Sequence, residues 1–393
     1  MRITISRLFC FFILASIAQS CTDDIKSTYI DYTDEEYELL TQRLNLPSEL
    51  HDYSPEFEEG FFNNHLEEEN IQSRRSSHKA TLGRVLFYDK TLSINELISC
   101  ASCHQQKLAF ADDVAFSEGF NGEVTARNSL PLGNTIGFET SYRGGNDFGF
   151  ENQALFSWDE SNSDISSQSK VAITSEVEMG LNMSELISRL KQQEDYKVLF
   201  KKAYGVQDIL EHRVLEAIEE FVNSIVSNHS KFDAESIAAD FNLFEDFSGY
   251  SAQENKGKAL YMDNCASCHS RDHQFTAIAT ANNGLDLNYI DKGVGEHSLD
   301  PSKVGVFKVP FLRNIELTGP YMHDGRFATL DDVINHYSEG VQNHHNLHNN
   351  LRSGNASKKM NFTIDNKASL KAYLLTLTDK EVIADAKFSD PFK

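Results

Sequence analysis

Two identical pentapeptides, Cys-Ala-Ser-Cys-His, are the residues of this chain whose types and spacing are best suited to chemistry. Two thiols followed at once by a histidine form the attachment sequence of c-type haem, in which the thiols hold the porphyrin and the histidine ligates the iron. A zinc site would need four ligands close together, and a redox dithiol needs no following histidine. The pattern therefore predicts two covalent haems, at Cys100, Cys103 and His104 and at Cys265, Cys268 and His269.

The elements that must position these motifs are expected to be helices. The motifs lie 165 residues apart, which predicts a separate domain for each haem. Alternating strand patterns are scarce, so we expect a mainly α fold with a first haem domain over 76–245 and a second over 246–393. Apolar residues at helical spacing predict helices over 82–88, 183–204, 209–227, 257–261 and 367–378.

The composition is that of an acidic globular protein. Its 36 Lys and Arg residues against 59 Asp and Glu give a formal net charge of −23. Such a chain lacks the positive surface that neutralises phosphates, so nucleic acid is not an expected partner. With 40% hydrophobic residues and 6 cysteines, the composition also excludes a disordered tail, a disulfide scaffold and a multi-span membrane protein.

The N-terminus, residues 1–20, has the layout of a secretory signal peptide, with Arg2 and Arg7 before an apolar stretch. Cys21 follows a small residue, as at the cleavage box of bacterial lipoproteins; an ordinary cleavage site and an uncleaved anchor are the alternatives. All three place the protein outside the cytoplasm, in the periplasm. Residues 22–75 carry 15 acidic and 4 basic side chains, which is typical of a solvated tether, the alternative being a docking site for a basic electron donor.

Two further motifs follow the second pentapeptide. Residues 308–314 read Lys-Val-Pro-Phe-Leu-Arg-Asn, and residues 318–326 read Thr-Gly-Pro-Tyr-Met-His-Asp-Gly-Arg. Together with the two widely spaced haem motifs, they resemble the bacterial di-haem cytochrome c peroxidase family, which also contains MauG, over residues 76–380. The resemblance implies two cytochrome-c-like, mostly helical domains, with His104 proximal to a peroxide-reacting haem and His269 proximal to an electron-transfer haem.

The active-site spacing of that family recurs in this chain. The resemblance places Trp158 between the haems and assigns Gln168 and Glu178, ten and twenty residues later, to the peroxide pocket. A carboxylate such as Glu178 can move a proton from one peroxide oxygen to the other. Gln168 would hydrogen-bond the peroxide or a water, and Trp158 would carry an electron or hole between the irons. The alternatives are a helix N-terminal carboxylate for Glu178 and core packing for Trp158.

The axial positions depart from the ordinary peroxidases of the family. Fourteen residues after the His-Asp-Gly histidine, where those enzymes have a methionine, this chain has Tyr337, as MauG does. A phenolate favours ferric iron and lowers the potential of the second haem. Met322 and Met360 are alternative ligands, although core packing is their more usual role. Sixteen residues after His104, where many members have a blocking histidine, stands Phe120, so the first haem is expected to be open to peroxide.

A calcium ion between the haems is also implied by the resemblance. Residues 127–129 match the Arg-Asn-Ser element of the family, and the ligands would be the Asn128 side chain and the carbonyls of Thr318 and Pro320. Oxygen donors of this kind suit a hard cation. A simple turn residue is the alternative for Asn128.

Three functions are compatible with these residues. A peroxidase, which reduces hydrogen peroxide to water with electrons from a small donor such as cytochrome c, is favoured by Glu178 and by the open first haem. A MauG-like oxidase of a protein or organic substrate is favoured by Tyr337, but Asp263 stands where MauG has a surface tryptophan. A di-haem electron carrier would leave Glu178 without a purpose. The sequence predicts the peroxidase and leaves a lipid anchor and a homodimer open.

Overall fold

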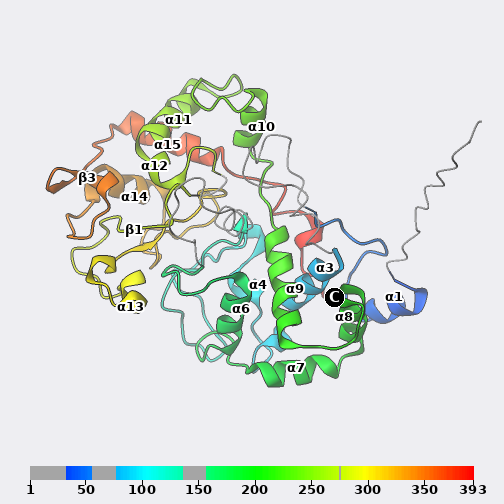
Figure 1. The fold of residues 1–393 in the computed structure, drawn as a ribbon. Coiled ribbons are helices and arrows are strands. Elements are labelled where there is room, and N and C mark those ends of the chain that lie inside the picture. Colours follow the sequence, from blue (N-terminus) through cyan, green and yellow to red (C-terminus); the bar gives the residue numbers. More distant parts are fainter. Residues whose placement is uncertain (1–31, 55–76, 136–155, 274–275) are drawn as a thin grey trace, which may run out of the picture.

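The computed structural model describes residues 32–54, 77–135, 156–273 and 276–393, and its elements are almost all helices (Figure 1). The expected signal segment, Cys21 and residues 22–31 and 55–75 of the acidic segment lie outside these residues. The mainly helical class is confirmed. The α-helices are α1 (Asp34–Leu40), α3 (Ser77–Tyr88), α4 (Cys100–Cys103), α6 (Ile165–Thr174), α7 (Met183–Lys191), α8 (Glu194–Tyr204), α9 (Glu211–Ser224), α10 (Lys231–Ala238), α11 (Ala252–Asn264), α12 (Ala266–His269), α13 (Val294–Ser298), α14 (Leu330–Asn335) and α15 (Ile364–Leu375).

The strands of the described residues are four pieces of two residues each. They form two antiparallel pairs, β1 (Thr280–Ala281) with β2 (Phe307–Lys308) and β3 (Arg352–Ser353) with β4 (Ala356–Ser357). Short 3-10 turns cover Lys90–Leu92, Gln106–Leu108, Pro301–Lys303, Asn349–Leu351 and Ala386–Phe388, and a π-helical turn covers His336–Gly340.

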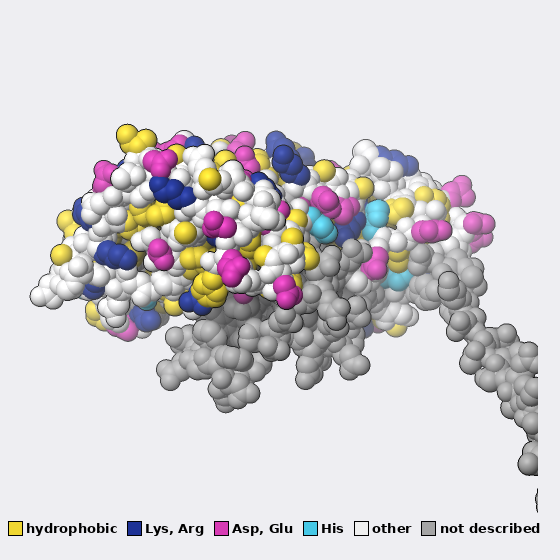
Figure 2. Space-filling view, turned by 90° about the horizontal axis from the view of Figure 1, so that it is seen from above, with side chains coloured by type: hydrophobic (Ala, Val, Ile, Leu, Met, Phe, Trp, Pro, Cys, Tyr) yellow, Lys and Arg dark blue, Asp and Glu magenta, His cyan; other side chains and the backbone are white. Residues whose placement is uncertain are grey.

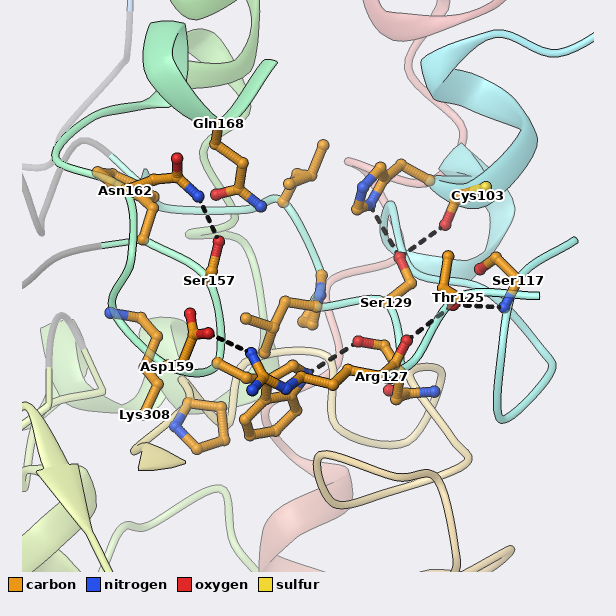
Figure 3. A pocket seen from close by; sticks show the side chains of 18 of the residues that line it. Cys103, Ser117, Thr125, Arg127, Ser129, Ser157, Asp159, Asn162, Gln168 and Lys308 are labelled. Atoms are coloured by element: carbon orange, nitrogen blue, oxygen red, sulfur yellow. Dashed lines mark hydrogen bonds and ion pairs between the residues drawn. The ribbon is translucent and has the colours of Figure 1, made fainter. Parts of the chain in front are cut away.

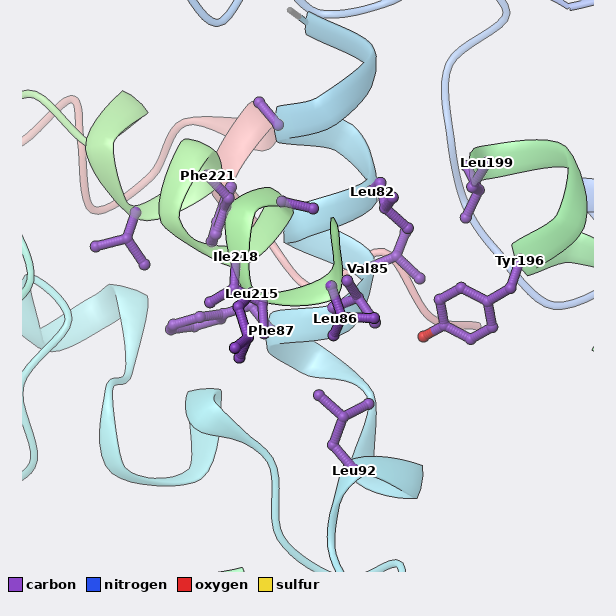
Figure 4. Packing of buried hydrophobic residues seen from close by; sticks show 14 of the residues in the cluster. Leu82, Val85, Leu86, Phe87, Leu92, Tyr196, Leu199, Leu215, Ile218 and Phe221 are labelled. Atoms are coloured by element: carbon purple, nitrogen blue, oxygen red, sulfur yellow. The ribbon is translucent and has the colours of Figure 1, made fainter. Parts of the chain in front are cut away.

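The first hydrophobic cluster forms where α3, α8 and α9 pack together (Figure 4). The helix expected over 209–227 is confirmed as α9, whose apolar residues recur every three or four positions and face α3. Burial of each large apolar side chain stabilises the fold by about 1.5–3 kcal/mol. Side chains fully or almost fully buried here include Leu82, Val85, Leu86 and Phe87 of α3 and Val214, Ile218 and Phe221 of α9.

The second hydrophobic cluster joins α10, α11, α14 and α15, and it is built largely from aromatic rings. Tyr261 of α11 and Tyr373 of α15 lie at its centre, each with 0% of its surface exposed. Phe232 of α10 packs against Tyr373, with 6.3 Å between ring centroids. The helix expected over 257–261 is therefore present as part of α11, and the helix expected over 367–378 is present in α15 up to Leu375, where α15 ends.

In each cluster a glycine lets the helix before a haem motif approach a later helix closely. A β-carbon at Gly83 of α3 would lie 1.8 Å from the carbonyl oxygen of Ala217 in α9. A β-carbon at Gly257 of α11 would lie 2.0 Å from the carbonyl oxygen of Ser369 in α15. Because only glycine permits such an approach, the same device sets the position of both motif-bearing segments.

Gly257→Ala is expected to lower the free energy of unfolding by about 1–3 kcal/mol, because the new methyl group must push α11 away from α15. Thermal unfolding of the haem-loaded protein, followed by circular dichroism, measures the effect. Gly133→Ala is the matched control, since a β-carbon there meets nothing within 4 Å. Equal melting temperatures for the two variants would show that the helices separate at no cost.

The single helix expected over 183–204 is wrong. The structure divides it into α7 and α8, with the break at Gln192 and Gln193. The break lets two apolar faces reach the first cluster at different angles: Leu186 and Leu190 from α7, and Tyr196, Leu199 and Phe200 from α8. The apolar spacing alone does not register this change of direction, because the pattern continues across the break.

The expectation of a solvated tether is wrong for residues 32–54. Leu40 and Leu44, four residues apart, have 0% of their surface exposed in the first cluster. Three acidic residues of this stretch, Asp34, Glu35 and Glu36, sit in the first turn of α1, where negative charge is favoured, and Glu36 completes a capping box with Thr33. Glu36 also pairs with Lys202 of α8 at 2.8 Å, which ties the segment to the body of the molecule.

The end of the chain returns to the first cluster, and Figure 1 shows the C-terminus beside α1 and α8. Val382 and Phe388 belong to the first cluster, and Arg84 donates a hydrogen bond of 2.6 Å to the carbonyl oxygen of Ser389.

On the face shown in Figure 2, acidic side chains are scattered among basic and apolar ones. No described helix combines the length and the hydropathy needed to cross a membrane. The domain boundaries at 76, 245 and 246 stay predictions.

Candidate active site

The first haem motif lies on α4, and the Nδ1 side of its histidine ring is held by hydrogen bonds. His104 Nδ1 lies 3.0 Å from the carbonyl oxygen of Phe110, which can only accept, so Nδ1 carries the proton. Burial lowers the pKa of His104, which keeps the ring neutral. Ser129 Oγ, 3.2 Å from Nδ1, donates to the carbonyl oxygen of Cys103 at 2.9 Å. The arrangement leaves Nε2 as the free metal-ligating nitrogen of an oriented imidazole.

The second motif repeats this construction at the end of α11 and in α12. His269 Nδ1 lies 3.0 Å from the carbonyl oxygen of Pro310, and burial lowers the pKa of His269 to about 4. Burial also raises the pKa of Cys100 and of Cys265 to about 12, so these are thiols rather than metal-binding thiolates at neutral pH. Both donor sets therefore fit a covalently attached haem.

A cavity of about 680 Å³ opens beside the first motif. Figure 3 shows Cys103 on one side of it and Gln168 of α6 on the opposite side. The structure thus brings the predicted catalytic residues and the first motif to one space, although Cys100 and Glu178 lie 78 positions apart in the sequence. Predicted site residues that line the cavity are Cys103, His104, Asn128, Trp158, Gln168 and Glu178.

Glu178 lies in the turn between α6 and α7. Its N–H contacts Ser175 Oγ at 3.2 Å, and its carbonyl oxygen accepts from Phe120 N–H at 2.9 Å. Burial raises the pKa of the Glu178 carboxyl. The alternative role as a helix N-terminal carboxylate does not hold, because the N-cap of α7 is Asn182, whose side chain accepts from Glu185 N–H.

Phe120 supports the Glu178 turn rather than lining the cavity. A β-carbon at Gly180 would lie 2.5 Å from the Phe120 ring, so the ring packs directly against the glycine two residues after Glu178. At Gly119 a β-carbon would lie 1.6 Å from the carbonyl oxygen of Val177. Two glycines therefore allow residues 119–120 and 177–180 to pack closely, which fixes the backbone position of Glu178.

Trp158 connects the two sides of the molecule. Its Nε1 donates to the carbonyl oxygen of Asn128 at 2.8 Å, and its own carbonyl oxygen accepts from Lys308 N–H at 2.8 Å. Its ring centroid lies 6.5 Å from that of His323, which stacks on Phe307 at 3.7 Å. Trp158 is 9% exposed, which is typical of a core residue. Its hydrogen bonds and ring contacts also connect it with the segments that follow each of the two motifs.

Sequence reasoning missed a group of charged residues around Trp158. Arg127 pairs with Asp159 at 2.6 Å and with Asp291 at 2.7 Å, and His297 Nε2 lies 2.6 Å from Asp159. Burial alone would raise the pKa of Asp159, but hydrogen bonds from Arg127 and other partners lower it to about 2. The sequence signals were the adjacency of Asp159 to Trp158 and the place of Arg127 in the Arg-Asn-Ser element, and neither indicates that Arg127 and Asp159 form a pair.

Lys308 also lines the cavity, and sequence reasoning assigned it no role there. It is 6% exposed, and burial lowers the pKa of its ammonium group to about 8. Its Nζ lies 6.0 Å from the centroid of the Phe156 ring, which also lines the cavity. The Lys308 ammonium group therefore loses its proton more readily than that of an exposed lysine, although it remains mostly charged at neutral pH.

Tyr337 lies in the π-helical turn over His336–Gly340, a rare geometry that is frequent at functional sites. Burial raises the pKa of its phenol; the side chain of Asn283 opposes this shift, and Cys268 and Cys265 add to it. The phenol is therefore near the second motif. Of the alternative ligands, Met322 accepts from Asn283 Nδ2 at 3.4 Å, and Met360 packs between hydrophobic clusters.

The residues named for calcium are placed as follows. Asn128 and Thr318 are buried, at 8% and 7% exposure, and Pro320 is half-buried. Asn128 Nδ2 donates to the carbonyl oxygen of Val114 at 3.1 Å, which leaves Oδ1 as the atom able to face a cation. Within the described ranges, no three His, Cys, Asp or Glu side chains are grouped as a metal site.

Comparison with known proteins identifies the family. A family model described as di-haem cytochrome c peroxidase matches residues 77–239. The methylamine utilization protein MauG of Methylophilus methylotrophus is 31% identical over 271 residues, which cover 67% of this chain and 73% of that protein. Cytochrome c551 peroxidase of Nitrosomonas europaea is 29% identical over 261 residues, which cover 65% of this chain and 71% of that protein.

Solved structures give the same result. The crystal structure of a MauG-like protein associated with microbial copper homeostasis is 31% identical, with a TM-score of 0.66, and the match covers 81% of this chain and 94% of that one. The di-haem peroxidase BthA of Burkholderia thailandensis shares the fold at 19% identity, with a TM-score of 0.57 over 81% of this chain and 90% of that one. With its haem motifs and cavity, the chain belongs to the di-haem cytochrome c peroxidase and MauG family.

Proposed function

We propose that the protein is a peroxidase that reduces hydrogen peroxide to water with electrons from a small reduced donor such as cytochrome c. Two c-type haems, one in each of two domains, and a calcium ion at Asn128, Thr318 and Pro320 belong to this proposal. The observation that carries it is the half-buried carboxyl of Glu178 in the cavity that His104 also lines.

The residues of the cavity have distinct tasks. When bound, haem iron at His104 supplies the electrons that cleave the oxygen–oxygen bond. Glu178 accepts the proton of one peroxide oxygen and returns it to the other oxygen, which leaves as water. A carboxyl with a raised pKa accepts a proton more readily than an ordinary glutamate and can still give it back. Gln168 holds the peroxide or a water by its amide, and Trp158 offers a polarisable path between the two haem sites. Phe120 leaves the cavity open, because its ring packs under Gly180.

A MauG-like oxidase is the second candidate, and Tyr337 is the observation that favours it. A tyrosinate at the second haem would lower its potential and stabilise oxidised iron. The protein would then pass oxidising equivalents to a protein or organic substrate rather than draw electrons from a cytochrome.

The deciding experiment is steady-state peroxide reduction by the haem-loaded, diferric protein with reduced cytochrome c, with the haem spectra recorded in the same cuvette. Many turnovers without prior reduction are expected. Rapid spectral change with little donor oxidation would transfer the assignment to the MauG-like oxidase. A resting spectrum without any high-spin haem would contradict both and indicate an electron carrier.

Tyr337→Phe tests the proposed axial ligand. Removing the phenol oxygen should convert the second haem to a different spin state and leave the first haem unaffected, as seen by electron paramagnetic resonance of the ferric protein. Tyr289→Phe is the matched control. Tyr289 lies in the same region, but its hydroxyl oxygen already accepts a hydrogen bond from Leu285 N–H at 3.0 Å. Unchanged spectra in Tyr337→Phe would refute the ligand assignment.

A further inference from the structure

The second hydrophobic cluster contains a group of buried aromatic residues that the peroxide cavity does not use. Tyr261, Tyr373 and His273 are at most 1% exposed, and Tyr250 is 7% exposed. The ring centroids of Tyr261 and Tyr373 are 5.2 Å apart, and those of Tyr373 and Tyr250 are 6.4 Å apart. Three phenols therefore form a continuous row of rings in contact.

One end of the row touches the second haem motif. Tyr261 lies one helical turn before Cys265, whose N–H donates to the Tyr261 carbonyl oxygen at 2.8 Å. The Tyr261 hydroxyl lies 2.6 Å from the carbonyl oxygen of Ser270 and 3.2 Å from that of His269. The first ring is thus fixed against the backbone of the residue that would ligate the second iron.

The middle phenol has a base as its partner. Tyr373 Oη lies 2.8 Å from His273 Nε2. Burial and the charge of Arg313 lower the pKa of His273, so its ring is neutral, and the 2.8 Å contact places Nε2 as the acceptor of the phenolic O–H. Arg313 Nε donates to the carbonyl oxygen of His273 at 2.9 Å, which holds this histidine in place. A buried phenol hydrogen-bonded to imidazole can lose an electron without leaving a positive charge on its own ring.

The other end of the row approaches the surface. The Tyr250 hydroxyl is bonded to Thr376 Oγ1 at 2.7 Å. Lys231 Nζ lies 5.1 Å from the centroid of the Tyr250 ring, and the Lys231 side chain is 45% exposed. A reductant that docks beside Lys231 would lie next to the Tyr250 ring, whose centroid is 6.4 Å from that of Tyr373.

We propose that Tyr261, Tyr373 and Tyr250 form a relay that carries oxidising equivalents from the second haem site to a one-electron donor at the surface beside Lys231. The relay rests on the proposed function, since hydrogen peroxide is the oxidant. Tyr373 gives one electron toward the second haem site, and its phenolic O–H bond breaks as the proton passes to His273 Nε2. The resulting neutral phenoxyl radical takes one electron from the donor through Tyr250, and the proton returns from His273 to the Tyr373 oxygen.

The test uses the haem-loaded protein and two separate oxidants, followed by freeze-quench electron paramagnetic resonance. One oxidant is hydrogen peroxide, and the other is flash-excited tris(bipyridine)ruthenium with a cobalt(III) quencher, which needs no peroxide chemistry. Protein grown on ring-deuterated tyrosine identifies the radical by the narrowing of its signal. The variants are Tyr373→Phe and His273→Gln, and the matched control is Tyr53→Phe, a tyrosine 2% exposed in the first cluster that donates to the Lys387 carbonyl.

We expect a tyrosyl radical in the parent protein and in Tyr53→Phe, loss of that signal in Tyr373→Phe, and slower radical formation in His273→Gln with a changed solvent deuterium isotope effect. Core packing alone would move none of these readouts while the haem spectra stay intact. A radical unchanged in Tyr373→Phe, or absent from the parent with both oxidants, overturns the relay even if peroxide still changes the haem spectra. A Tyr373-dependent radical seen only with ruthenium, in a protein whose haem spectra peroxide leaves unchanged, supports the relay and overturns the peroxidase proposal.

Discussion

Glu178→Gln is expected to keep both haems and to slow peroxide activation by about 100-fold to 10,000-fold, the usual contribution of a general acid–base group. The amide preserves the size and hydrogen-bonding shape of the side chain but cannot take and return a proton. The surrounding turn should not move, because Ser175 and Phe120 hold residue 178 by its backbone. Stopped-flow mixing of the diferric protein with peroxide measures the rate constant directly.

Glu176→Gln is the matched control for this experiment. Glu176 lies in the same turn, two residues earlier, but it is exposed and does not line the cavity. The control should react with peroxide at the rate of the parent protein. A Glu178→Gln variant that reacts as fast as the control would remove the carboxyl from the mechanism and leave proton movement to a water.

The pH dependence gives an independent test of the same group. Burial raises the pKa of Glu178, and only the deprotonated carboxylate can accept the peroxide proton. The rate constant should therefore be highest above that pKa and fall as the pH decreases through it, at a pH higher than for an exposed glutamate. This acid limb should be absent from Glu178→Gln. An acid limb that persists in the variant would belong to another group.

The part of the site that could be predicted from sequence is the part set by local chemistry. A thioether-bound haem needs two thiols and a histidine in one short segment, so Cys100, Cys103 and His104 can be identified from the sequence without knowledge of the fold. The apolar spacing of α9 is equally local, because its buried residues recur every three or four positions. For Glu178, general chemistry favoured a helix terminus, and the family spacing pointed instead to the pocket that the residue lines.

What sequence reasoning missed depends on contacts between distant segments. The charge of Arg127 is balanced by Asp159 and Asp291, which lie 32 and 164 positions later, and nothing in the order of the residues pairs them. Gly83 carries no side-chain signal, yet its missing β-carbon determines how closely α3 meets α9. A one-dimensional pattern reports which face of an element is apolar, but not which other element covers that face.

Arg313→Leu is expected to lower the free energy of unfolding by about 3–5 kcal/mol, because it leaves a buried carboxylate without its cation. Arg313 and Asp233 are 3% and 2% exposed at their side chains, and two parallel hydrogen bonds of 2.8 and 2.9 Å join them. The loss should extend to the second haem site, because Arg313 lies three residues after Pro310, whose carbonyl orients His269. Urea unfolding followed by circular dichroism, with the haem spectrum recorded in parallel, measures both effects.

The double variant Arg313→Leu with Asp233→Leu separates the cost of the unpaired charge from the value of the pair. Replacing both partners by apolar groups removes the buried charge altogether, so most of the lost stability should return. Arg313→Lys should fall between, because lysine keeps the charge but cannot make the two-pronged bond. A double variant as unstable as Arg313→Leu would mean that the pair itself stabilises the packing of α10 on the second cluster. In the single variant Arg313→Leu the Asp233 carboxylate keeps its hydrogen bonds from the N–H and hydroxyl of Ser230, at 2.9 and 2.6 Å, which limits the cost of the lost cation.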